Sequence, residues 1–293
     1  MSLLRRSVPG AGTHLRKTEV VIGSVTLPNP VMTASGTAGH GDELSRYVDL
    51  ADLGAVVVKS LLPEPWPGNE GTRVHATDSG MVNRVGLQGP GIEAWLEDDL
   101  PRLRRTGARV VASIWGRTVE EYAKGAAMLA GTGVVAVEIN LSCPNTHAGR
   151  SLFAHDERAT EEVLDATAAA GVPRWAKLSP NTDRLVDIAE AARRGGAEAV
   201  TLINTVFAMV HGRAGGLSGP AIHPIAVRAV HDVHAAHPDL PIIGVGGVRN
   251  AATARDLLEA GAVAVQVGTA TFADPRATAK VLAGLRSTST REA

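Results

Sequence analysis

Val134-Val135-Ala136-Val137-Glu138-Ile139 is a mostly apolar run that leads directly into Asn140-Leu141-Ser142-Cys143-Pro144-Asn145. The first stretch is rich in valine and isoleucine and scarcely alternates, which is typical of a strand buried on both faces of a parallel sheet. The second stretch places polar groups where that strand would end. Cys143 is the only cysteine, so it has no disulfide partner within the chain. Its position predicts a reactive thiol; the alternative is a small buried apolar side chain.

Runs of the same kind occur on both sides of this stretch, at Pro30–Ala34, Ala55–Lys59, Arg109–Ile114, Arg174–Leu178, Ala199–Ile203, Pro241–Val245 and Val263–Val267. Together they make eight, the number of strands in a (β/α)8 or TIM barrel. The intervening segments have helical periodicity, as Leu185, Ile188 and Ala192 illustrate. We therefore predict an α/β fold with an N-terminal tail, residues 1–18, and a single barrel domain, residues 19–293.

Local signals add detail to this prediction. Val20–Leu27 has the pattern of a β-hairpin that could plug the amino end of the barrel. Asn250 is placed to cap a helix that Gly261 would end. Thr118 and Glu121 have the spacing of a capping box at the start of another helix.

Two segments lack any regular pattern. Leu61–Val82 is rich in proline and glycine, and Val206–Ile222 is rich in glycine. We expect both to be long irregular loops. Because both follow strands, they would lie on the face of a barrel that carries the active site.

Composition excludes several classes of function. The formal net charge is −1 and aromatic residues make up 3% of the chain, which argues against nucleic acid and anionic membranes as partners. No apolar stretch approaches the roughly 20 residues of a membrane span. A lone cysteine and the lack of an apolar signal core favour the cytoplasm.

Metal and histidine chemistry also find little support. No HExxH or CxxC pattern occurs, so we expect no metal site. Four of the ten histidines lie on or beside one helix, and we expect them to be solvated: His223, His231, His234 and His237.

Polar residues and glycines follow the strands in a way that indicates a ligand site. Gly246-Gly247 and Gly268-Thr269 follow the last two strands, where barrels commonly bind phosphate through backbone N–H groups. Lys59 and Lys177 end two other strands. They are either ordinary surface lysines or cations for a bound anion or an electron-rich ring, such as a reduced flavin.

Four asparagines stand near strand ends: Asn83, Asn140, Asn145 and Asn204. Each one alone is explained equally well as a turn residue. Together their amides could satisfy the carbonyl and N–H groups of a cyclic imide such as a dihydropyrimidine.

The motifs that surround these residues resemble those of the class 1 dihydroorotate dehydrogenases, and most closely the catalytic subunit of subclass 1B. The resemblance extends from about Glu19 to Leu285. It rests on Ala34-Ser35-Gly36, Asn83–Gln88, Asn140–Asn145, Lys177–Asn181, Ile203-Asn204-Thr205, Gly215–Pro220, Gly246-Gly247-Val248 and Val267–Ala270.

This resemblance implies a cytoplasmic, FMN-containing barrel that oxidises dihydroorotate to orotate in pyrimidine biosynthesis. Cys143 would be the base that removes the C5 proton while C6 passes hydride to flavin N5. The implied FMN contacts are Ser35, Lys59, Ser60, Asn140, Lys177, Ile203, Gly219, Gly246, Gly247, Gly268 and Thr269, with Ser113 at the position of an FMN-contacting asparagine. The implied substrate contacts are Lys59, Asn83, Val85, Gly86, Leu87, Asn140, Asn145, Asn204 and Thr205.

The chain departs from the family pattern at several places. Ser113 replaces an asparagine, Arg84 stands inside the substrate turn, and the loop after Thr205 is about ten residues shorter. An alternative is therefore the same chemistry on another dihydropyrimidine or specialised-metabolite ring. A third reading is a non-redox phosphate-binding barrel, such as an aldolase, an isomerase or a binding protein.

The resemblance also implies partners. It predicts a homodimer and a separate subunit, carrying FAD and an iron–sulfur cluster, that passes electrons to NAD⁺. A chain with one cysteine could not ligate such a cluster itself. Without that subunit, fumarate or another small oxidant would be needed.

Overall fold

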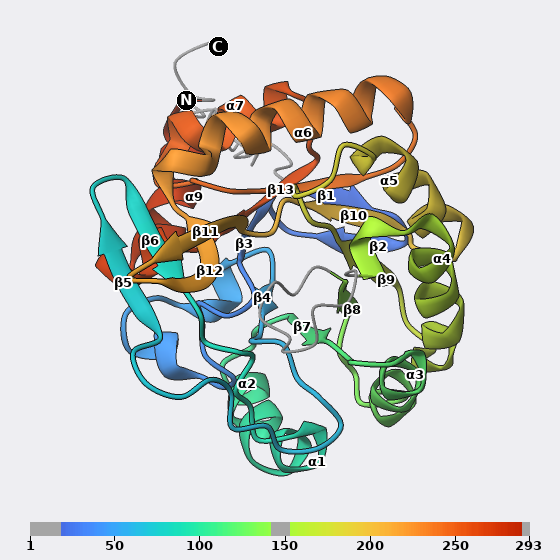
Figure 1. Ribbon diagram of the computed structural model, residues 1–293. Coiled ribbons are helices and arrows are strands. Elements are labelled where there is room, and N and C mark those ends of the chain that lie inside the picture. The colour runs from blue at the N-terminus through green and yellow to red at the C-terminus, as the bar shows by residue number, and fades with distance from the viewer. Residues whose placement is uncertain (1–18, 142–152, 289–293) are drawn as a thin grey trace, which may run out of the picture.

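The computed structural model describes residues 19–141 and 153–288, and its centre is a parallel sheet closed into a barrel (Figure 1). Its eight strands are hydrogen-bonded in the order β3-β14-β13-β10-β9-β8-β7-β4. A bridge between Met32 and Ala55 joins the two outer strands and completes the ring. The predicted (β/α)8 barrel is confirmed. The strands are β3 (Val31–Thr33), β4 (Val56–Val57), β7 (Val110–Ile114), β8 (Ala136–Asn140), β9 (Arg174–Lys177), β10 (Ala199–Leu202), β13 (Ile242–Val245) and β14 (Ala264–Val267).

Helices surround the strands on the outside (Figure 1). They are α1 (Ile92–Ala94), α2 (Leu100–Arg105), α3 (Val119–Met128), α4 (Glu157–Ala166), α5 (Leu185–Arg194), α6 (His223–Ala236), α7 (Ala251–Glu259), α8 (Ala270–Ala273) and α9 (Ala277–Thr288). A π-helical turn, Trp95–Asp99, joins α1 to α2. Short 3-10 turns lie at Glu43–Arg46, Leu50–Asp52, Phe153–His155, Thr167–Ala170 and Pro220–Ile222.

The ends of three helices follow from local sequence. Helix α5 buries Ile188, Ala189 and Ala192 against the barrel and ends at Gly195, as the periodicity predicts. Asn250 caps α7 by accepting a hydrogen bond from the N–H of Thr253. At α3 only half of the predicted capping box forms. Thr118 accepts from the N–H of Glu121, and the Glu121 carboxylate accepts from the N–H of Arg117, one residue before the cap.

The predicted N-terminal hairpin is confirmed and closes the amino end of the barrel. Strands β1 (Val20–Ile22) and β2 (Val25–Leu27) pair antiparallel. Ile22 and Leu27 are fully buried, and they pack in one cluster with Met32, Val57, Trp175 and other inward-facing strand residues. The hairpin therefore acts as an apolar plug.

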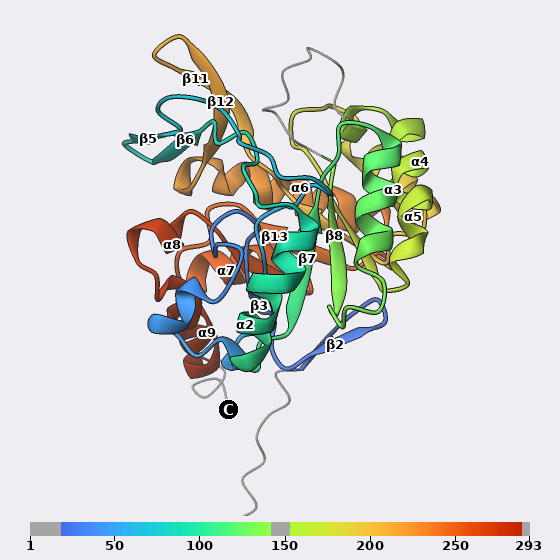
Figure 2. The ribbon, with the colours of Figure 1, turned by 90° about the horizontal axis from the view of Figure 1, so that it is seen from below.

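The two segments expected to be irregular loops are only partly so: residues 61–73 contain no named helix or strand, but most of the remainder forms paired strands, and for that part the expectation was wrong. Strands β5 (Val74–Thr77), β6 (Gly80–Asn83), β11 (Val206–Val210) and β12 (Arg213–Ser218) form an antiparallel sheet in the order β11-β12-β6-β5. Figure 2 shows this sheet at the end of the barrel opposite the hairpin. The pairing of Asn83 with Gly216 joins segments far apart in sequence, and only the closed barrel brings them together.

Among residues 19–141 and 153–288, no helix combines the length and the apolar character that crossing a membrane requires.

Candidate active site

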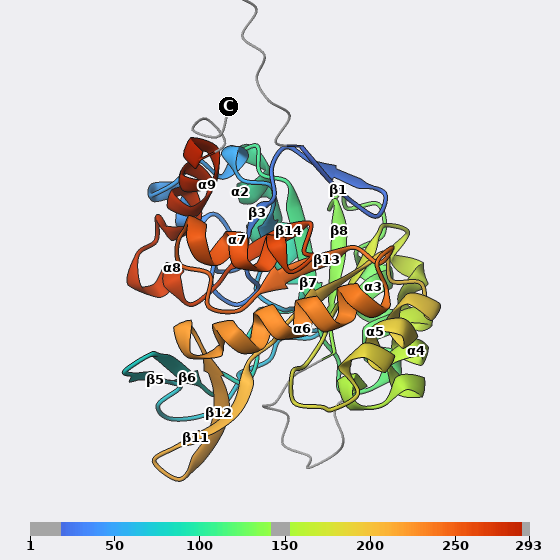
Figure 3. The same ribbon diagram turned by 90° about the horizontal axis from the view of Figure 1, so that it is seen from above.

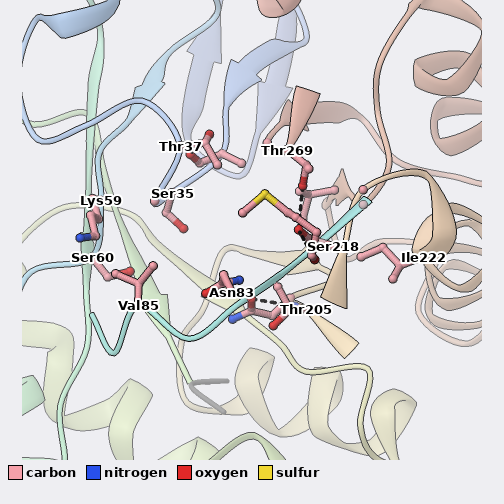
Figure 4. A pocket seen from close by; sticks show the side chains of 18 of the residues that line it. Ser35, Thr37, Lys59, Ser60, Asn83, Val85, Thr205, Ser218, Ile222 and Thr269 are labelled. Carbon is pink, nitrogen blue, oxygen red and sulfur yellow. Dashed lines mark hydrogen bonds between the residues drawn. The ribbon is translucent and has the colours of Figure 1, made fainter. Parts of the chain in front are cut away.

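A pocket opens at the carboxyl end of the barrel, between the strand ends and the antiparallel sheet (Figure 4). Its space amounts to about 1080 Å³ including the open mouth. The residues that line it include most of those singled out in the sequence: Ser35, Lys59, Ser60, Asn83, Val85, Gly86, Leu87, Asn140, Lys177, Ile203, Asn204, Thr205, Gly219, Gly246, Gly247, Gly268 and Thr269.

Of the predicted site residues that the structure describes, Ser113 does not line the pocket. Ser113 is completely buried and lies behind the pocket wall, where its hydroxyl is 2.8 Å from that of Ser60. Cys143 and Asn145 lie outside the described residues. Asn140, three positions before Cys143, does line the pocket.

A buried carboxylate, that of Glu138, lies at the floor of the pocket and was not singled out in the sequence. It is fully inaccessible. It accepts hydrogen bonds from Gln266 (2.8 Å), Ser113 (3.3 Å) and Thr201 (3.4 Å). Burying a carboxyl group this completely is costly unless hydrogen-bond donors surround it, and these three side chains supply such donors.

Lys177 connects this network to the pocket. Its Nζ lies 3.8 Å from Oε1 of Glu138 and donates to the Ser35 hydroxyl at 3.0 Å. Its side chain is almost completely buried. The ammonium is thus held between a buried carboxylate and the pocket, so Lys177 is not an ordinary surface lysine.

The second cation, Lys59, lies at the mouth. Its ammonium donates to the backbone carbonyl of Gln88 at 2.7 Å. Burial lowers the pKa of Lys59, and the guanidinium of Arg73 lowers it further. Burial and Lys59 together lower the pKa of His40 to about 4, although Glu43 acts in the opposite direction. This side of the pocket carries positive charge suited to a small carboxylate.

Two of the amides form one connected group. Asn204 donates to Oδ1 of Asn140 at 3.3 Å, and Asn140 donates to the hydroxyl of Ser60 at 3.2 Å. Asn83, on β6, reaches the same pocket from the antiparallel sheet and donates to the carbonyl of Gly216. The oxygen of Asn204 also accepts from the N–H of Thr205. The carboxyl ends of the strands and the segments that follow them therefore contribute side chains to one pocket, as expected.

The glycine-rich end of the pocket permits close approach of backbone to a ligand. Gly246 and Gly247 have φ values of +133° and +70°, a region that favours glycine. A Cβ on Gly246 would stand 2.7 Å from the Cβ of Ala226, and one on Gly247 would stand 2.6 Å from that of His223. The Thr269 hydroxyl lies nearby, bonded to that of Ser218 at 2.9 Å. Such a cradle suits a phosphate group.

The histidines of α6 are only partly as expected. The side chain of His231 is 67% exposed, whereas that of His223 is 13% exposed and bonded on both ring nitrogens. For His223 the expectation of a solvated ring was wrong, because the ring contacts Asp256 of α7 and the backbone carbonyl of Gly246.

Arg84 does not obstruct the pocket. It stands between the lining residues Asn83 and Val85, but its guanidinium donates to the carbonyl of Glu70. The alternation of side chains along the extended backbone explains why neighbours of a pocket residue point elsewhere.

Several lining residues were missed from the sequence: Ala34, Gly36, Thr37, Val74, Met81, Ser218, Ile222, Val245 and Phe272. Ala34, Gly36 and Ser218 lie inside motifs that were recognised. Met81 and Phe272 carry no local signal, because an apolar residue near a strand or helix end is equally typical of the core. In the described ranges, no group of His, Cys, Asp and Glu is arranged to hold a metal ion.

Comparison with known proteins agrees with this geometry. The family model described as "Dihydroorotate dehydrogenase" matches residues 17–288. A protein of Alkaliphilus oremlandii named "Dihydroorotate dehydrogenase B (NAD(+)), catalytic subunit" is 46% identical over 281 residues, covering 92% of this chain and 93% of its own length. A protein of Desulforudis audaxviator with the same name is 47% identical and covers 92% of this chain and 91% of its own length. The match spans the whole barrel, and the chain belongs to the dihydroorotate dehydrogenase family.

Proposed function

We propose that this chain is an FMN-dependent oxidoreductase that oxidises dihydroorotate to orotate in pyrimidine biosynthesis. One observation carries the proposal: a single pocket at the carboxyl end of the barrel joins a glycine cradle, a buried lysine and a group of amides. Membership of the family and the names of its close relatives support the same activity. We further propose one FMN-binding domain, residues 19–293, located in the cytoplasm.

The residues fit FMN at both of its ends. We assign the phosphate to the backbone of Gly219, Gly246, Gly247 and Gly268 and to Thr269. We assign the flavin ring to Ser35, Ser60, Asn140, Lys177 and Ile203, with Lys59 at the mouth and Ser113 supporting Ser60 from behind. When bound there, FMN would supply the acceptor for hydride from C6 of the substrate.

The flavin fit rests on charge as well as shape. The ammonium of Lys177 lies against the pocket, and its contacts with Glu138 and the Ser35 hydroxyl hold it in place. A fixed cation beside an aromatic ring system stabilises negative charge on that ring. The family match and the relatives named as dehydrogenases favour this redox activity over the non-redox alternative.

The substrate would lie between the cofactor and the antiparallel sheet. Lys59 offers a cation for its carboxylate. The amides of Asn83, Asn140, Asn145 and Asn204, the hydroxyl of Thr205 and the turn of Val85, Gly86 and Leu87 offer partners for the ring. We assign to Cys143 the removal of the C5 proton, because a thiol loses its own proton closer to neutral pH than a serine hydroxyl does.

The proposed partners follow from the names of the relatives, which are catalytic subunits of an NAD⁺-dependent enzyme. We propose that a second subunit, with FAD and an iron–sulfur cluster, takes the electrons to NAD⁺. The sequence contains a single cysteine, so this chain cannot ligate the cluster. We also propose that the chain forms a homodimer.

Anaerobic titration of the purified protein tests the proposal. We expect a yellow protein whose flavin absorbance bleaches on addition of dihydroorotate. A panel of other dihydropyrimidines serves as the comparison, because Arg84 points away from the pocket and leaves room for the ordinary substrate. A colourless protein that takes up no FMN would overturn the proposal. Bleaching by another dihydropyrimidine and not by dihydroorotate would keep the chemistry and change the substrate.

A further inference from the structure

We propose that His223 is a positioning residue for the phosphate of the flavin. It acts through the backbone of Gly246-Gly247 and is itself anchored by Asp256. The inference rests on the proposed use of FMN and adds residues that do not line the pocket. His223 is the first residue of α6, and Asp256 belongs to α7, which lies beside α6 (Figure 3).

The two ring nitrogens of His223 have fixed partners. Nδ1 lies 2.8 Å from the carbonyl oxygen of Gly246, and Nε2 lies 3.0 Å from a carboxylate oxygen of Asp256. A carbonyl oxygen can only accept a hydrogen bond, so Nδ1 carries a hydrogen. The contact of Nε2 with Asp256 anchors the other side of the ring, so the imidazole is held at both of its nitrogens.

The contact with Gly246 fixes the direction of the next N–H group. The peptide bond between Gly246 and Gly247 is trans. In a planar trans peptide the carbonyl and the following N–H point in opposite directions. Because His223 holds the carbonyl of Gly246 toward α6, the N–H of Gly247 is turned away from α6. Both glycines line the pocket, so this N–H is available to a phosphate oxygen there.

Glycine by itself does not hold such a direction. Gly247 has φ of +70°, and a residue without Cβ rotates between alternative backbone conformations at little cost. His223 removes that freedom from one side, since its ring is 13% exposed and confined between two helices. The phosphate therefore meets an N–H group that is already oriented, which reduces the entropic cost of binding.

A binding experiment with two flavins isolates this effect. FMN and riboflavin differ by the phosphate alone, so a residue that orients a phosphate donor affects only FMN. The flavin-free chain is titrated with each flavin, and the dissociation constants are compared for His223→Leu, His223→Asn and Asp256→Ala. His231→Leu is the matched control, because His231 is an exposed histidine on the same helix.

We expect His223→Leu to weaken FMN binding by about 10- to 100-fold, the range for one hydrogen bond to a charged group such as the phosphate, and riboflavin binding by less than about twofold. His223→Asn should recover most of the affinity for FMN, because its amide N–H can occupy the place of Nδ1. Asp256→Ala should weaken FMN binding by a smaller factor, about 3- to 10-fold, since the ring loses its second anchor. His231→Leu should change neither constant.

Equal binding of FMN by His223→Leu and the unsubstituted chain overturns the inference, and so does an equal loss for both flavins, which would indicate a general packing role. If His223→Leu does not fold, Asp256→Ala decides the question, because its carboxylate is about half exposed and an FMN-selective loss is then required. If the unsubstituted chain takes up neither flavin, the proposed function itself fails and not this inference alone.

Discussion

The two ends of the barrel interior are built by the same strands from opposite kinds of residue. On β9, Trp175 points into the apolar cluster under the hairpin, and Lys177, two positions later, points into the polar floor of the pocket. On β8 the same change separates Ala136 from Glu138 and Asn140. Residues two apart on a strand face the same side. A step of two residues along a strand therefore leads to the next layer of side chains inside the barrel.

The difference shows that the amino end of the barrel serves stability and that the carboxyl end serves ligand binding. The amino end is sealed by side chains that make no hydrogen bonds, and it can be optimised for packing alone. The carboxyl end contains a buried carboxylate, an ammonium and several amides that are satisfied only in one arrangement. A polar layer of this kind is a cost to folding that serves ligand binding. Substitutions at the two ends should therefore have different consequences.

The largest effect is expected just beyond the carboxyl end of β8. Cys143→Ala should lower the rate of flavin reduction by dihydroorotate about 10²- to 10⁴-fold, because no group remains to take the C5 proton. Anaerobic stopped-flow measurement of flavin absorbance gives this rate. The affinity for FMN should be unchanged, and Cys143→Ser is the conservative comparison. A near-normal rate in Cys143→Ala would exclude this residue as the base.

Substitutions at the amino end should lower the free energy of unfolding and leave the reaction in the pocket unchanged. Leu27→Ala removes a fully buried side chain from the plug, so we expect a loss of about 3 kcal/mol in the free energy of unfolding. Chemical denaturation followed by circular dichroism measures it. Val21→Ala is the matched control on the same hairpin, because Val21 is 60% exposed and should cost less than about 0.5 kcal/mol. A similar loss for both variants would contradict the plug.

A third substitution tests whether the polar floor also contributes to folding. Glu138→Gln keeps the shape of the side chain but leaves the nearby ammonium of Lys177 without its counter-charge. We expect the flavin-free chain to lose about 2 kcal/mol of unfolding free energy.

The control for this prediction is a double variant. Glu138→Gln combined with Lys177→Met removes the unpaired charge, so the double variant should lose less than the two single losses added together. Strict additivity would mean that the two groups do not interact, and the carboxyl-end network would then be a set of separate contacts.

The smallest expected effect is a pH dependence confined to the carboxyl end. The pKa of His40 is lowered from 6.5 to about 4, chiefly by burial, so the folded state binds fewer protons than the unfolded state between these values. Stability contributed by the neutral ring is complete above pH 6.5 and is lost as the pH falls toward 4. We expect about 1 kcal/mol after allowing for the partial exposure of the ring.

His40→Gln should remove this contribution, because glutamine does not titrate. Free energies of unfolding measured at pH 7 and pH 4.5 would then differ less in the variant than in the unsubstituted chain. An unchanged difference would assign the acid sensitivity to other groups.

Much of the fold could be predicted because each barrel strand is recognisable from its own residues. Val134–Ile139 was expected as a strand, and β8 spans Ala136–Asn140. The caps at Asn250 and the hairpin at Val20–Leu27 were equally local and are confirmed. Strands buried on both faces need continuous apolar sequence, and that pattern is visible without any knowledge of neighbours.

The site was predicted less completely, and the misses share a physical cause. Glu138 stands in a mostly apolar run, where its charge has no local explanation. Its partners Ser113, Thr201 and Gln266 come from three other strands. Likewise His223 meets Asp256 only because α6 and α7 lie side by side. Contacts between elements leave no signal in the sequence of either element.

The sequence by itself determined the eight strands, the glycines and lysines at their ends and the family to which the chain belongs, because these depend on patterns within short segments and on motifs in a fixed order. Only the tertiary structure decided that β5, β6, β11 and β12 pair into one sheet over the pocket, that Arg84 turns away from it and that Glu138 lies next to Lys177. Hydrogen bonds between distant backbones and the placement of a buried charge depend on which surfaces meet, and that is settled only when the barrel closes.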